Sequence, residues 1–311
     1  MLDKALKRIS LEKKLWLIRN TQKNFVPEDQ LYLFSDPRGG STWLTELLLE
    51  IPDTTVLWEP LRPDHIKELK KLHFSFRQHI PKDAFWPEAK LVFDKINSGS
   101  IINEWTALKT TPERFKKANK LIIKYCRGNA LLPWFCEQYD IKLPPVYLIR
   151  HPFGVAASQL KQGGWDYQFK GFNIPGGPYN NLYLKHKEFL LSLKSKEEAL
   201  VATWCLTNMV PLSESNKKWI EVFYEDLVIQ PEVEINKIFD QWSMDIPPNI
   251  VTKVRTPSST SLKRDDIIAP EKQLSSWKDY FNEHQLDKMQ NVLDYFDVEL
   301  YSKMTIYPIS T

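Results

Sequence analysis

Short apolar runs alternate with longer segments of helical periodicity along most of this chain. Runs with the length and character of buried strands occur at 31–35, 55–59, 121–125, 145–149 and 219–224. Helical segments follow them, at 42–50, 63–73, 130–139, 152–162 and 231–242. Short strands separated by helices indicate βαβ units, and hence a parallel sheet covered by helices. We therefore predict an α/β fold.

The chain shows no linker, repeat or low-complexity stretch that would divide it further. We predict a single domain over 29–311, preceded by an N-terminal arm over 1–28. Within the arm, residues 2–20 mix leucine, isoleucine and tryptophan with lysine and arginine, as in an imperfect amphipathic helix with a basic face. We expect the arm to pack on the domain. The alternative is contact of the basic face with a membrane surface or a partner.

Composition narrows the class of protein. The chain has 311 residues, is 42% apolar and carries a net charge of +3, so disordered and fibrous classes are excluded. This charge does not by itself indicate nucleic-acid binding, and an anionic partner would be held by locally placed Arg and Lys. The three cysteines lack CxxC spacing, which argues against a disulfide framework. With no secretory core and no spanning segment, we expect a cytoplasmic protein.

The loop after the first predicted strand carries the residues expected at a phosphate site. Its glycines let the backbone approach a ligand, its hydroxyls lie at a helix start where free amides favour anions, and its arginine adds a permanent cation. These residues are Arg38, Gly39, Gly40, Ser41 and Thr42. The Walker pattern GxxxxGK[ST] is absent, which weakens an ATP or GTP interpretation.

A second loop occupies the same position after the strand at 145–149. Arg150 stands at the strand end, and Ser158 lies on the facing turn of the next helix. The two side chains can converge on a second phosphate. The sequence thus offers two anion-binding loops far apart along the chain.

Together these loops resemble the sulfotransferases that use 3′-phosphoadenosine 5′-phosphosulfate (PAPS). Residues 37–43 are similar to the 5′-phosphosulfate loop P-[KR]-[ST]-G-[ST]-[ST], and 150–158 to the 3′-phosphate motif R-x-P-x(5)-S. Residues 223–227 resemble the family's YEDL segment, and 276–281 its C-terminal W-K-x-x-F stretch. The four motifs occur in the family's order.

The resemblance implies a P-loop NTPase-like sheet and PAPS as co-substrate, with no metal. It assigns the amides of 38–43 to the 5′-phosphosulfate and Arg38 to the transferred group. It places Trp43 against adenine, and Arg150 with Ser158 on the 3′-phosphate. The remaining nucleotide contacts that it implies are Tyr224, Lys263 and Arg264. The alternative for Lys263 and Arg264 is that they are solvated charges of a loop. Gly39 departs from the family pattern, where Ser or Thr is common.

The residue expected to act as general base differs most from the pattern of the phenol and steroid sulfotransferases. In the phenol and steroid enzymes a histidine follows the third strand, but Cys126 occupies that position here. Trp58-Glu59-Pro60 resembles the E-P element of Golgi-type carbohydrate sulfotransferases, so Glu59 is predicted as the base, with His65 as the fallback. We expect burial against tryptophan to raise the pKa of Glu59.

Glu59, Arg38 and the missing histidine favour a carbohydrate or glycolipid acceptor. Lipid or small-molecule hydroxyls are the alternative within the class. A nucleotide-dependent kinase and a non-catalytic nucleotide-binding scaffold are the alternatives outside it. The long segment 163–179, with Trp165, Tyr167 and Phe172, is predicted as a lid over the acceptor; the alternative is a connection anchored to the core by its aromatics.

Overall fold

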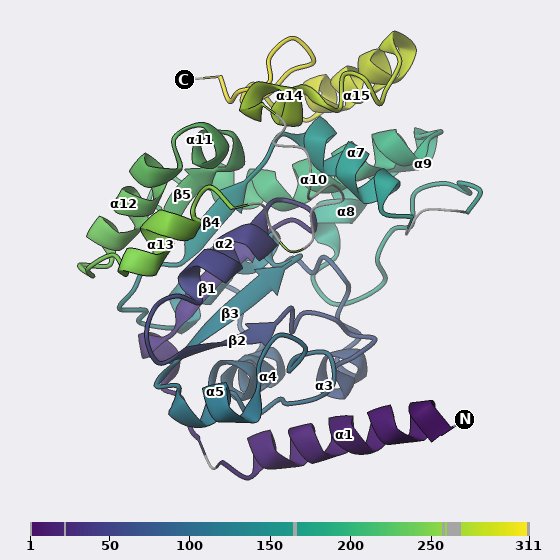
Figure 1. Cartoon of the computed structure of the whole chain (residues 1–311). Coiled ribbons are helices and arrows are strands. Elements are labelled where there is room, and N and C mark those ends of the chain that lie inside the picture. Colours follow the sequence, from purple (N-terminus) through teal and green to yellow (C-terminus); the bar gives the residue numbers. More distant parts are fainter. Residues whose placement is uncertain (1, 22, 164–166, 257–258, 260–268, 310–311) are drawn as a thin grey trace.

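Five parallel strands form the centre of the molecule, which we describe from a computed structural model (Figure 1). The structure describes residues 2–21, 23–163, 167–256, 259 and 269–309. The sheet order is β2-β3-β1-β4-β5. The strands are β1 (Leu31–Ser35), β2 (Thr54–Trp58), β3 (Lys120–Cys126), β4 (Val146–Ile149) and β5 (Ile220–Phe223).

β1 is the central strand and brings the ends of its neighbours beside its own. In register, Ser35 at its end lies opposite Cys126 of β3 and Leu148 of β4. The chain runs from β1 to one side of the sheet and later crosses to the other side to form β4. A ligand site is expected where such an order reverses, beyond the carboxyl ends of the strands.

Alternate side chains of the strands face two separate cores, because successive residues of a strand point to opposite faces. Leu31 and Leu33 share one core with helices α2 (Ser41–Leu48), α11 (Tyr224–Ile229), α12 (Pro231–Gln241), α13 (Pro248–Lys253) and α14 (Pro270–Ser275). Tyr32 and Phe34 face the larger core. Its main helices are α4 (Pro87–Asn97), α6 (Leu132–Gln138), α7 (Pro152–Lys161), α10 (Lys196–Leu212) and α15 (Glu283–Tyr295).

Shorter elements complete the layers. They are α1 (Leu2–Arg19), η1 (Pro27–Asp29), α3 (Lys67–Lys71), α5 (Pro112–Lys117), η2 (Asn129–Leu131), α8 (Asn181–Lys185) and α9 (Lys187–Ser192). Several helices begin with proline, whose fixed φ and missing N–H suit a first turn. α15 instead begins at a capping box between Asn282 and Gln285.

The predicted α/β architecture is confirmed. Each predicted strand overlaps an observed one, and the strand at 31–35 has the predicted bounds. The helix predicted over 63–73 is shorter, because α3 covers only Lys67–Lys71 and a turn precedes it. Ile66, directly before α3, has extended backbone angles, with φ of −115° and ψ of 104°, and so separates the preceding turn from the helix.

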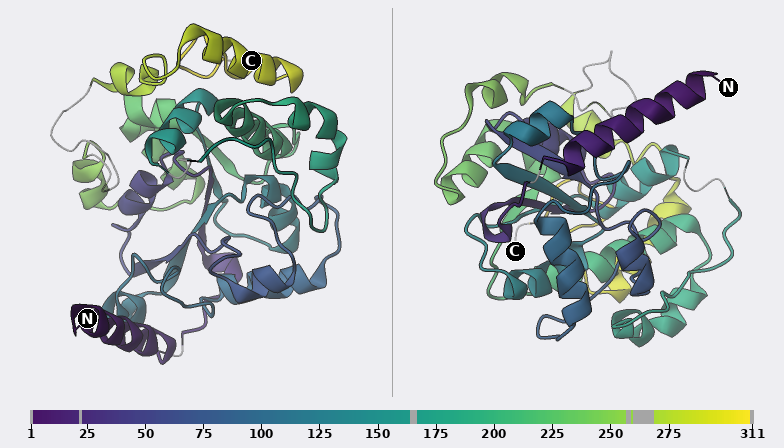
Figure 2. Two further views of the ribbon diagram at one scale, coloured as in Figure 1. Left: turned by 90° about the vertical axis from the view of Figure 1, so that its right-hand side faces the viewer. Right: turned by 90° about the horizontal axis from the view of Figure 1, so that it is seen from below.

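The N-terminal helix packs on the domain. Leu15 and Ile18 are buried in the larger core, with exposed fractions of 4% and 1%. Lys14 donates to the carbonyl of Ala107 at 2.7 Å, which ties the helix to a loop of the domain. α1 and α15 lie at opposite ends of the molecule (Figure 2). Among the described helices, none is both long and apolar enough to cross a membrane.

Candidate functional site

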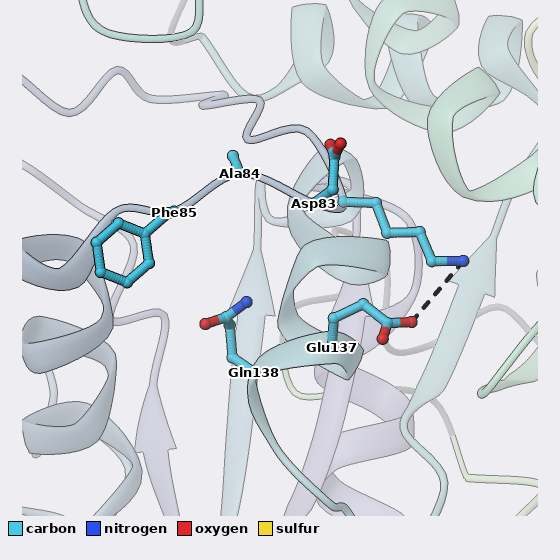
Figure 3. Close-up of a pocket in the computed structure, with 6 residues that line it drawn as sticks. Asp83, Ala84, Phe85, Glu137 and Gln138 are labelled. Carbon is cyan, nitrogen blue, oxygen red and sulfur yellow. Dashed lines mark ion pairs between the residues drawn. The ribbon is translucent and has the colours of Figure 1, made fainter.

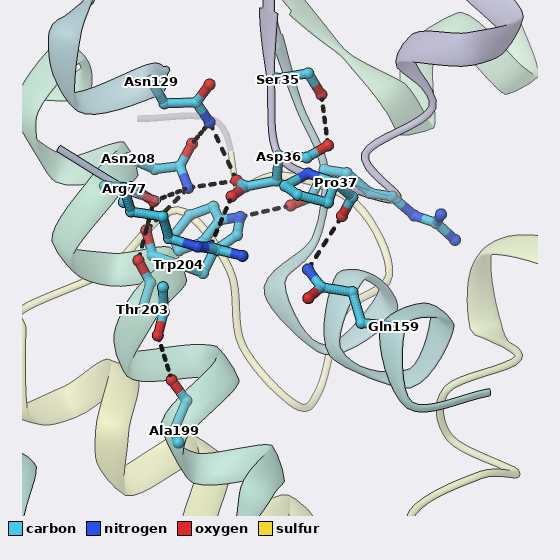
Figure 4. Close-up of polar contacts among 12 residues, drawn as sticks. Ser35, Asp36, Pro37, Arg77, Asn129, Gln159, Ala199, Thr203, Trp204 and Asn208 are labelled. Carbon is cyan, nitrogen blue, oxygen red and sulfur yellow. Dashed lines mark hydrogen bonds and ion pairs between the residues drawn. The ribbon is translucent and has the colours of Figure 1, made fainter. Parts of the chain in front are cut away.

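The two predicted anion loops meet beyond the ends of β1 and β4. Arg38 Nε donates to Ser158 Oγ at 3.1 Å, and Arg150 Nη1 donates to the carbonyl of Arg38 at 2.9 Å. The amide of Gln159 donates to the carbonyl of Pro37 at 3.0 Å (Figure 4). The structure therefore joins motifs that lie more than a hundred residues apart in the sequence.

Both glycines of the first loop occupy places where a side chain would not fit. A Cβ on Gly40 would lie 2.3 Å from the ring of Tyr224, and its φ of +97° is in the left-handed region. A Cβ on Gly39 would lie 2.4 Å from Ser35 Oγ. The departure from the family pattern at position 39 thus has a steric reason, because this loop has no room for Ser or Thr there.

Tyr224, the first residue of α11, contacts both loops through its ring. Its ring lies under Gly40, and the guanidinium of Arg150 stands 4.4 Å from the ring centroid. Its hydroxyl accepts a hydrogen bond from Gln273 at 2.7 Å. The YEDL segment therefore positions Arg150 by a cation–π contact.

The amino end of α2 follows the first loop without a side-chain cap. Ser41 Oγ lies 3.4 Å from Cys126 Sγ, and Thr42 Oγ1 accepts a hydrogen bond from Lys124 Nζ at 3.0 Å. The buried indole nitrogen of Trp43 has no hydrogen-bond partner among the described residues. An uncapped helix start with an unsatisfied donor beside it fits an anionic ligand with further polar groups.

Arg38 and Arg150 form no close ion pair among the described residues. Within the described part of the chain, neither guanidinium lies within 4 Å of a carboxylate, whereas many other cations of the protein do. Burial, together with repulsion from Arg150, lowers the pKa of Arg38 from its ordinary value. Two adjacent, partly buried guanidinium groups are therefore better accommodated when an anion lies between them.

Glu59 is the centre of a second cluster, one residue beyond β2. Its carboxylate accepts from Lys124 Nζ at 3.1 Å and from Arg127 Nη1 at 3.3 Å. Lys124 also stands 3.6 Å from the ring centroid of Trp58, and its side chain is only 2% exposed. Through Lys124, the cluster is joined to the hydroxyl of Thr42 at the start of α2.

The predicted rise in the pKa of Glu59 is wrong. Burial does raise the pKa of this carboxyl, but the charges of Lys124 and Arg127 outweigh burial and leave it below its ordinary value. The sequence showed the tryptophan beside Glu59, whereas the two cations approach from β3 and the loop after it. Glu59 is therefore ionised at neutral pH, and it is a weaker base than predicted.

Three of the eight non-glycine residues with positive φ in the described chain lie at this place. Arg38, Glu59 and Arg127 have φ angles of 69°, 39° and 73°, in the left-handed region that L-residues rarely adopt. They follow β1, β2 and β3, respectively. Such strained residues are concentrated at functional sites, where the surrounding structure holds them.

The other candidate acid–base groups differ in their surroundings. Cys126 is buried, and burial raises the pKa of its thiol to about 11, so the group stays protonated. His151 is buried under Trp277, and burial lowers its pKa to about 3; its Nδ1 accepts from the amide of Phe153 at the start of α7. His65 stacks on Trp105, with 4.6 Å between ring centroids.

A buried polar network behind the loop that follows β1 was not predicted from the sequence. Asp36 accepts hydrogen bonds from Asn129 at 3.1 Å and Asn208 at 2.7 Å, and Arg77 lies 3.6 Å away on the other oxygen (Figure 4). Burial raises the pKa of Asp36. Asn208 was detectable, because it is a lone amide in an apolar helix, but Arg77 comes from irregular chain and left no pattern.

Some predicted residues lie outside the described part of the chain, namely Lys263, Arg264 and Trp165. The described part of the predicted lid is tied down. Gln78 donates to the carbonyl of Pro178 at 2.6 Å, and Phe172 and Tyr179 pack against the larger core. These contacts favour the anchored connection over the lid for residues 172–179.

A separate surface hollow of about 430 Å³ lies away from both loops (Figure 3). None of the predicted site residues lines it; its walls are Lys82, Asp83, Ala84, Phe85, Glu137 and Gln138. Within the described residues, no three His, Cys, Asp or Glu side chains are grouped to hold a metal ion.

Comparison with solved structures finds sulfotransferases of low identity. The chain is similar to the sulfotransferase domain of the Synechococcus PCC 7002 olefin synthase, with 17% identity and a TM-score of 0.46 over 90% of this chain and 98% of that one. Mouse sulfotransferase SULT7A1, complexed with PAP, gives 14% identity and 0.46 over 91% and 89%. The sulfotransferase domain of the curacin biosynthetic pathway gives 15% and 0.46 over 88% and 99%.

No protein-family model and no curated protein sequence matches the chain. Likenesses this distant do not establish an activity. The functional conclusion has to come from the residues of the site.

Proposed function

We propose that this protein is a sulfotransferase that moves a sulfuryl group from PAPS to a hydroxyl of its acceptor. The observation that carries the proposal is the junction of the two anion loops. Arg38 and Arg150 lie side by side without a carboxylate partner among the described residues, next to the uncapped start of α2. A nucleotide with phosphate groups at both its 5′ and 3′ positions matches two joined anion sites, whereas a simple ATP site needs no second loop.

The binding roles follow from these positions. The start of α2 and its glycines receive the 5′ end of the nucleotide, and Arg150 with Ser158 receives the 3′-phosphate. Tyr224 holds Arg150 in place from below. Trp43, whose indole N–H lacks a partner, is assigned to the base. Lys263 and Arg264 remain proposed outer contacts.

The chain's own groups can assist transfer from several sides. The donor supplies an activated sulfuryl group, and in the transfer its S–O bond to the 5′-phosphate breaks while the acceptor oxygen forms a new bond to sulfur. Arg38 and Lys124 provide fixed positive charge near that end of the site. Glu59, ionised at neutral pH, is assigned to take the acceptor's proton. Lys124 donates hydrogen bonds to both Glu59 and Thr42, and so connects the proposed base to the start of α2.

A carbohydrate or glycolipid acceptor is our finer proposal. It is supported by Glu59 in the E-P element and by the inert thiol of Cys126 where the phenol and steroid enzymes have histidine. Transfer of labelled sulfate from PAPS to a panel of glycans, glycolipids, simple lipids and phenols tests this choice. Labelling of phenols alone would contradict it while leaving the sulfotransferase proposal intact.

Calorimetry with product nucleotide tests the binding site without any acceptor. We expect 3′-phosphoadenosine 5′-phosphate to bind without metal, and to bind more tightly than its 3′-dephosphorylated form by about 10–150-fold, the value of a charge-assisted contact of roughly 1.5–3 kcal/mol. Arg150→Ala should remove this difference. Arg255→Ala is a matched control, because Arg255 is an exposed arginine paired with Glu232. Equal affinities in the wild-type protein would refute the 3′-phosphate assignment.

Kinetics separate binding from transfer. Arg38→Ala should lower kcat more than it weakens product-nucleotide binding, and Arg150→Ala should chiefly raise the KM for PAPS. Loss of donor affinity alone in both variants would remove Arg38 from the chemical step. Magnesium-dependent transfer of phosphate from ATP would favour the kinase instead, and nucleotide binding without any turnover would favour a scaffold.

A further inference from the structure

Helix α1 has two apolar faces, and only one of them is used by the fold. Leu11, Leu15 and Ile18, spaced four and three residues apart, face the domain and pack in or against its larger core. Leu6, Ile9 and Trp16 lie on the outer side, with exposed fractions of 57%, 64% and 62%. The outer residues share a stripe of their own, because three and four residues separate 6, 9, 13 and 16.

This stripe differs from the other exposed apolar residues of the protein. Single exposed residues such as Val233 and Val251 are normal on a soluble surface. Here an apolar row runs along more than two turns of one helix, which lies at an end of the molecule (Figure 2). Leu17, 36% exposed, widens it. An apolar row of this kind indicates a binding surface.

The charge of α1 indicates what covers the stripe. Its sequence has six basic and two acidic residues, an excess of four positive charges, while the whole chain carries only +3. The rest of the protein is therefore net −1, and the positive charge of the molecule is concentrated on this helix. Lys13 lies within the stripe, and Lys4 and Arg8 are exposed on the same helix, with the long stems that let cations reach past an apolar surface.

We infer that α1 docks the protein on an anionic membrane surface, with Leu6, Ile9 and Trp16 in the interface and the exposed Lys4, Arg8 and Lys13 against acidic headgroups. An amphipathic helix with tryptophan on the apolar side and lysine and arginine around it has the composition of an interfacial helix. A second copy of the chain fits less well, because pairing two such helices would bring their excess positive charges together. The inference does not depend on the proposed activity.

The domain holds α1 rigidly enough to orient it. Besides the buried Leu15 and Ile18, Arg19 donates two hydrogen bonds to the carbonyl of Ile102, at 3.0 and 2.8 Å. The same loop contains Trp105, whose indole N–H donates to the carbonyl of Glu59 at 3.1 Å. Docking through α1 would thus hold the whole molecule, including the candidate site, at a defined orientation to the membrane.

Cosedimentation of the full chain with lipid vesicles tests the inference. We expect the protein to pellet with vesicles of phosphatidylcholine and phosphatidylserine at low salt, and much less with phosphatidylcholine alone or at high salt. The combined variant Leu6→Ser, Ile9→Ser and Trp16→Ser should weaken binding about tenfold or more. Arg8→Gln with Lys13→Gln should weaken it by about 25-fold, roughly fivefold for each cation.

Matched controls are available on other helices. Val233→Ser with Val251→Ser removes exposed apolar residues from α12 and α13, and Lys272→Gln with Lys187→Gln removes exposed cations from α14 and α9. These variants should bind vesicles as the wild type does, and all variants should keep the wild-type Tm. No pelleting of the wild type at low salt would overturn the inference, as would full binding by the α1 variants. A dimer in sedimentation velocity that the serine variant dissolves would assign the stripe to a second copy and overturn it as well.

Discussion

Glu59→Gln should destabilise the protein as well as impair transfer, and the structure allows the size of the effect to be worked out. The amide keeps the shape of the carboxyl group but loses the charge that both Lys124 and Arg127 face. The side chain of Lys124 is 2% exposed and that of Glu59 is 15% exposed, so water cannot take over the lost role. The variant therefore leaves a buried ammonium group without its counter-ion.

Removal of one partner from a buried ion pair costs about 3–5 kcal/mol. Lys124 would keep its hydrogen bond to Thr42 and its contact with the ring of Trp58, which places the expected loss near the lower end, about 3 kcal/mol. The unfolding entropy of a chain of 311 residues is about 650 cal/mol/K, so the Tm should fall by about 5 °C.

The stability difference between wild type and Glu59→Gln should also depend on pH in a defined direction. Because the pKa of Glu59 is lowered in the folded protein, its stabilising effect is complete above the unfolded value of about 4.3. The effect is lost as pH falls through the lower folded pKa. The stability difference between wild type and Glu59→Gln should therefore be constant from about pH 5 to 8 and narrow below about pH 4.

A double-mutant cycle measures the pair itself. Chemical denaturation would be followed for Glu59→Gln, Lys124→Met and their combination, since methionine keeps the apolar stem of lysine without its charge. Glu232→Gln is the control: its partner Arg255 is exposed, so the loss should stay within about 1 kcal/mol. A coupling energy below about 0.5 kcal/mol between Glu59 and Lys124 would refute this account of the site.

The same variants separate two roles of Glu59 in transfer. If Glu59 is the general base, Glu59→Gln should lower kcat by about 10²–10⁴-fold, and Lys124→Met should lower kcat by less. If Glu59 only positions Lys124, Glu59→Gln should lower kcat by no more than Lys124→Met does. The comparison is made on kcat at a temperature where both variants are folded.

Three further predictions concern other residues of the site. Because burial lowers the pKa of His151 to about 3, the unfolded state takes up its proton first on acidification, and stability should fall by about 2 kcal/mol from pH 7 to pH 5; His151→Asn should lack this loss in denaturation curves measured across that range. Gly40→Ala should lower stability by at least about 1–2 kcal/mol and abolish nucleotide binding in calorimetry, because φ is +97° and the new Cβ would meet the ring of Tyr224; an unchanged Tm would show that the loop relaxes freely. Cys126→Ala should keep near-normal turnover, since a thiol with a pKa of about 11 is protonated at neutral pH, and a collapse of kcat without unfolding would give the thiol a role.

The hydrophobic pattern predicted the strands, their order along the chain and the loops that carry the candidate site. The reason is that these features are local. Buried parallel strands read as short apolar runs, and Gly39 and Gly40 follow the first of them directly. The pairing of Arg150 with the first loop was also predictable, because parallel strands place their carboxyl ends on one edge of the sheet.

The charge state of the candidate base depends on residues that packing brings to it. Trp58 is next to Glu59 in the sequence and suggested a raised pKa, but Lys124 and Arg127 come from β3 and its following loop and reverse the direction. Arg77, which lies 3.6 Å from Asp36, shows the same limit. It belongs to a segment without periodicity, and only packing brings it behind the loop that follows β1.

For the outer stripe of α1, too, one part is visible in the sequence and another depends on packing. Its mixture of apolar and basic residues is visible in the sequence, but which apolar residues face the domain depends on where Leu15 and Ile18 find a core to enter. A charge or a hydrophobic side chain acts on whatever lies within a few ångströms of it, and at these positions the neighbours are remote in sequence. Local pattern therefore fixed the elements, and long-range packing fixed the electrostatics of the site and the exposed face of the helix.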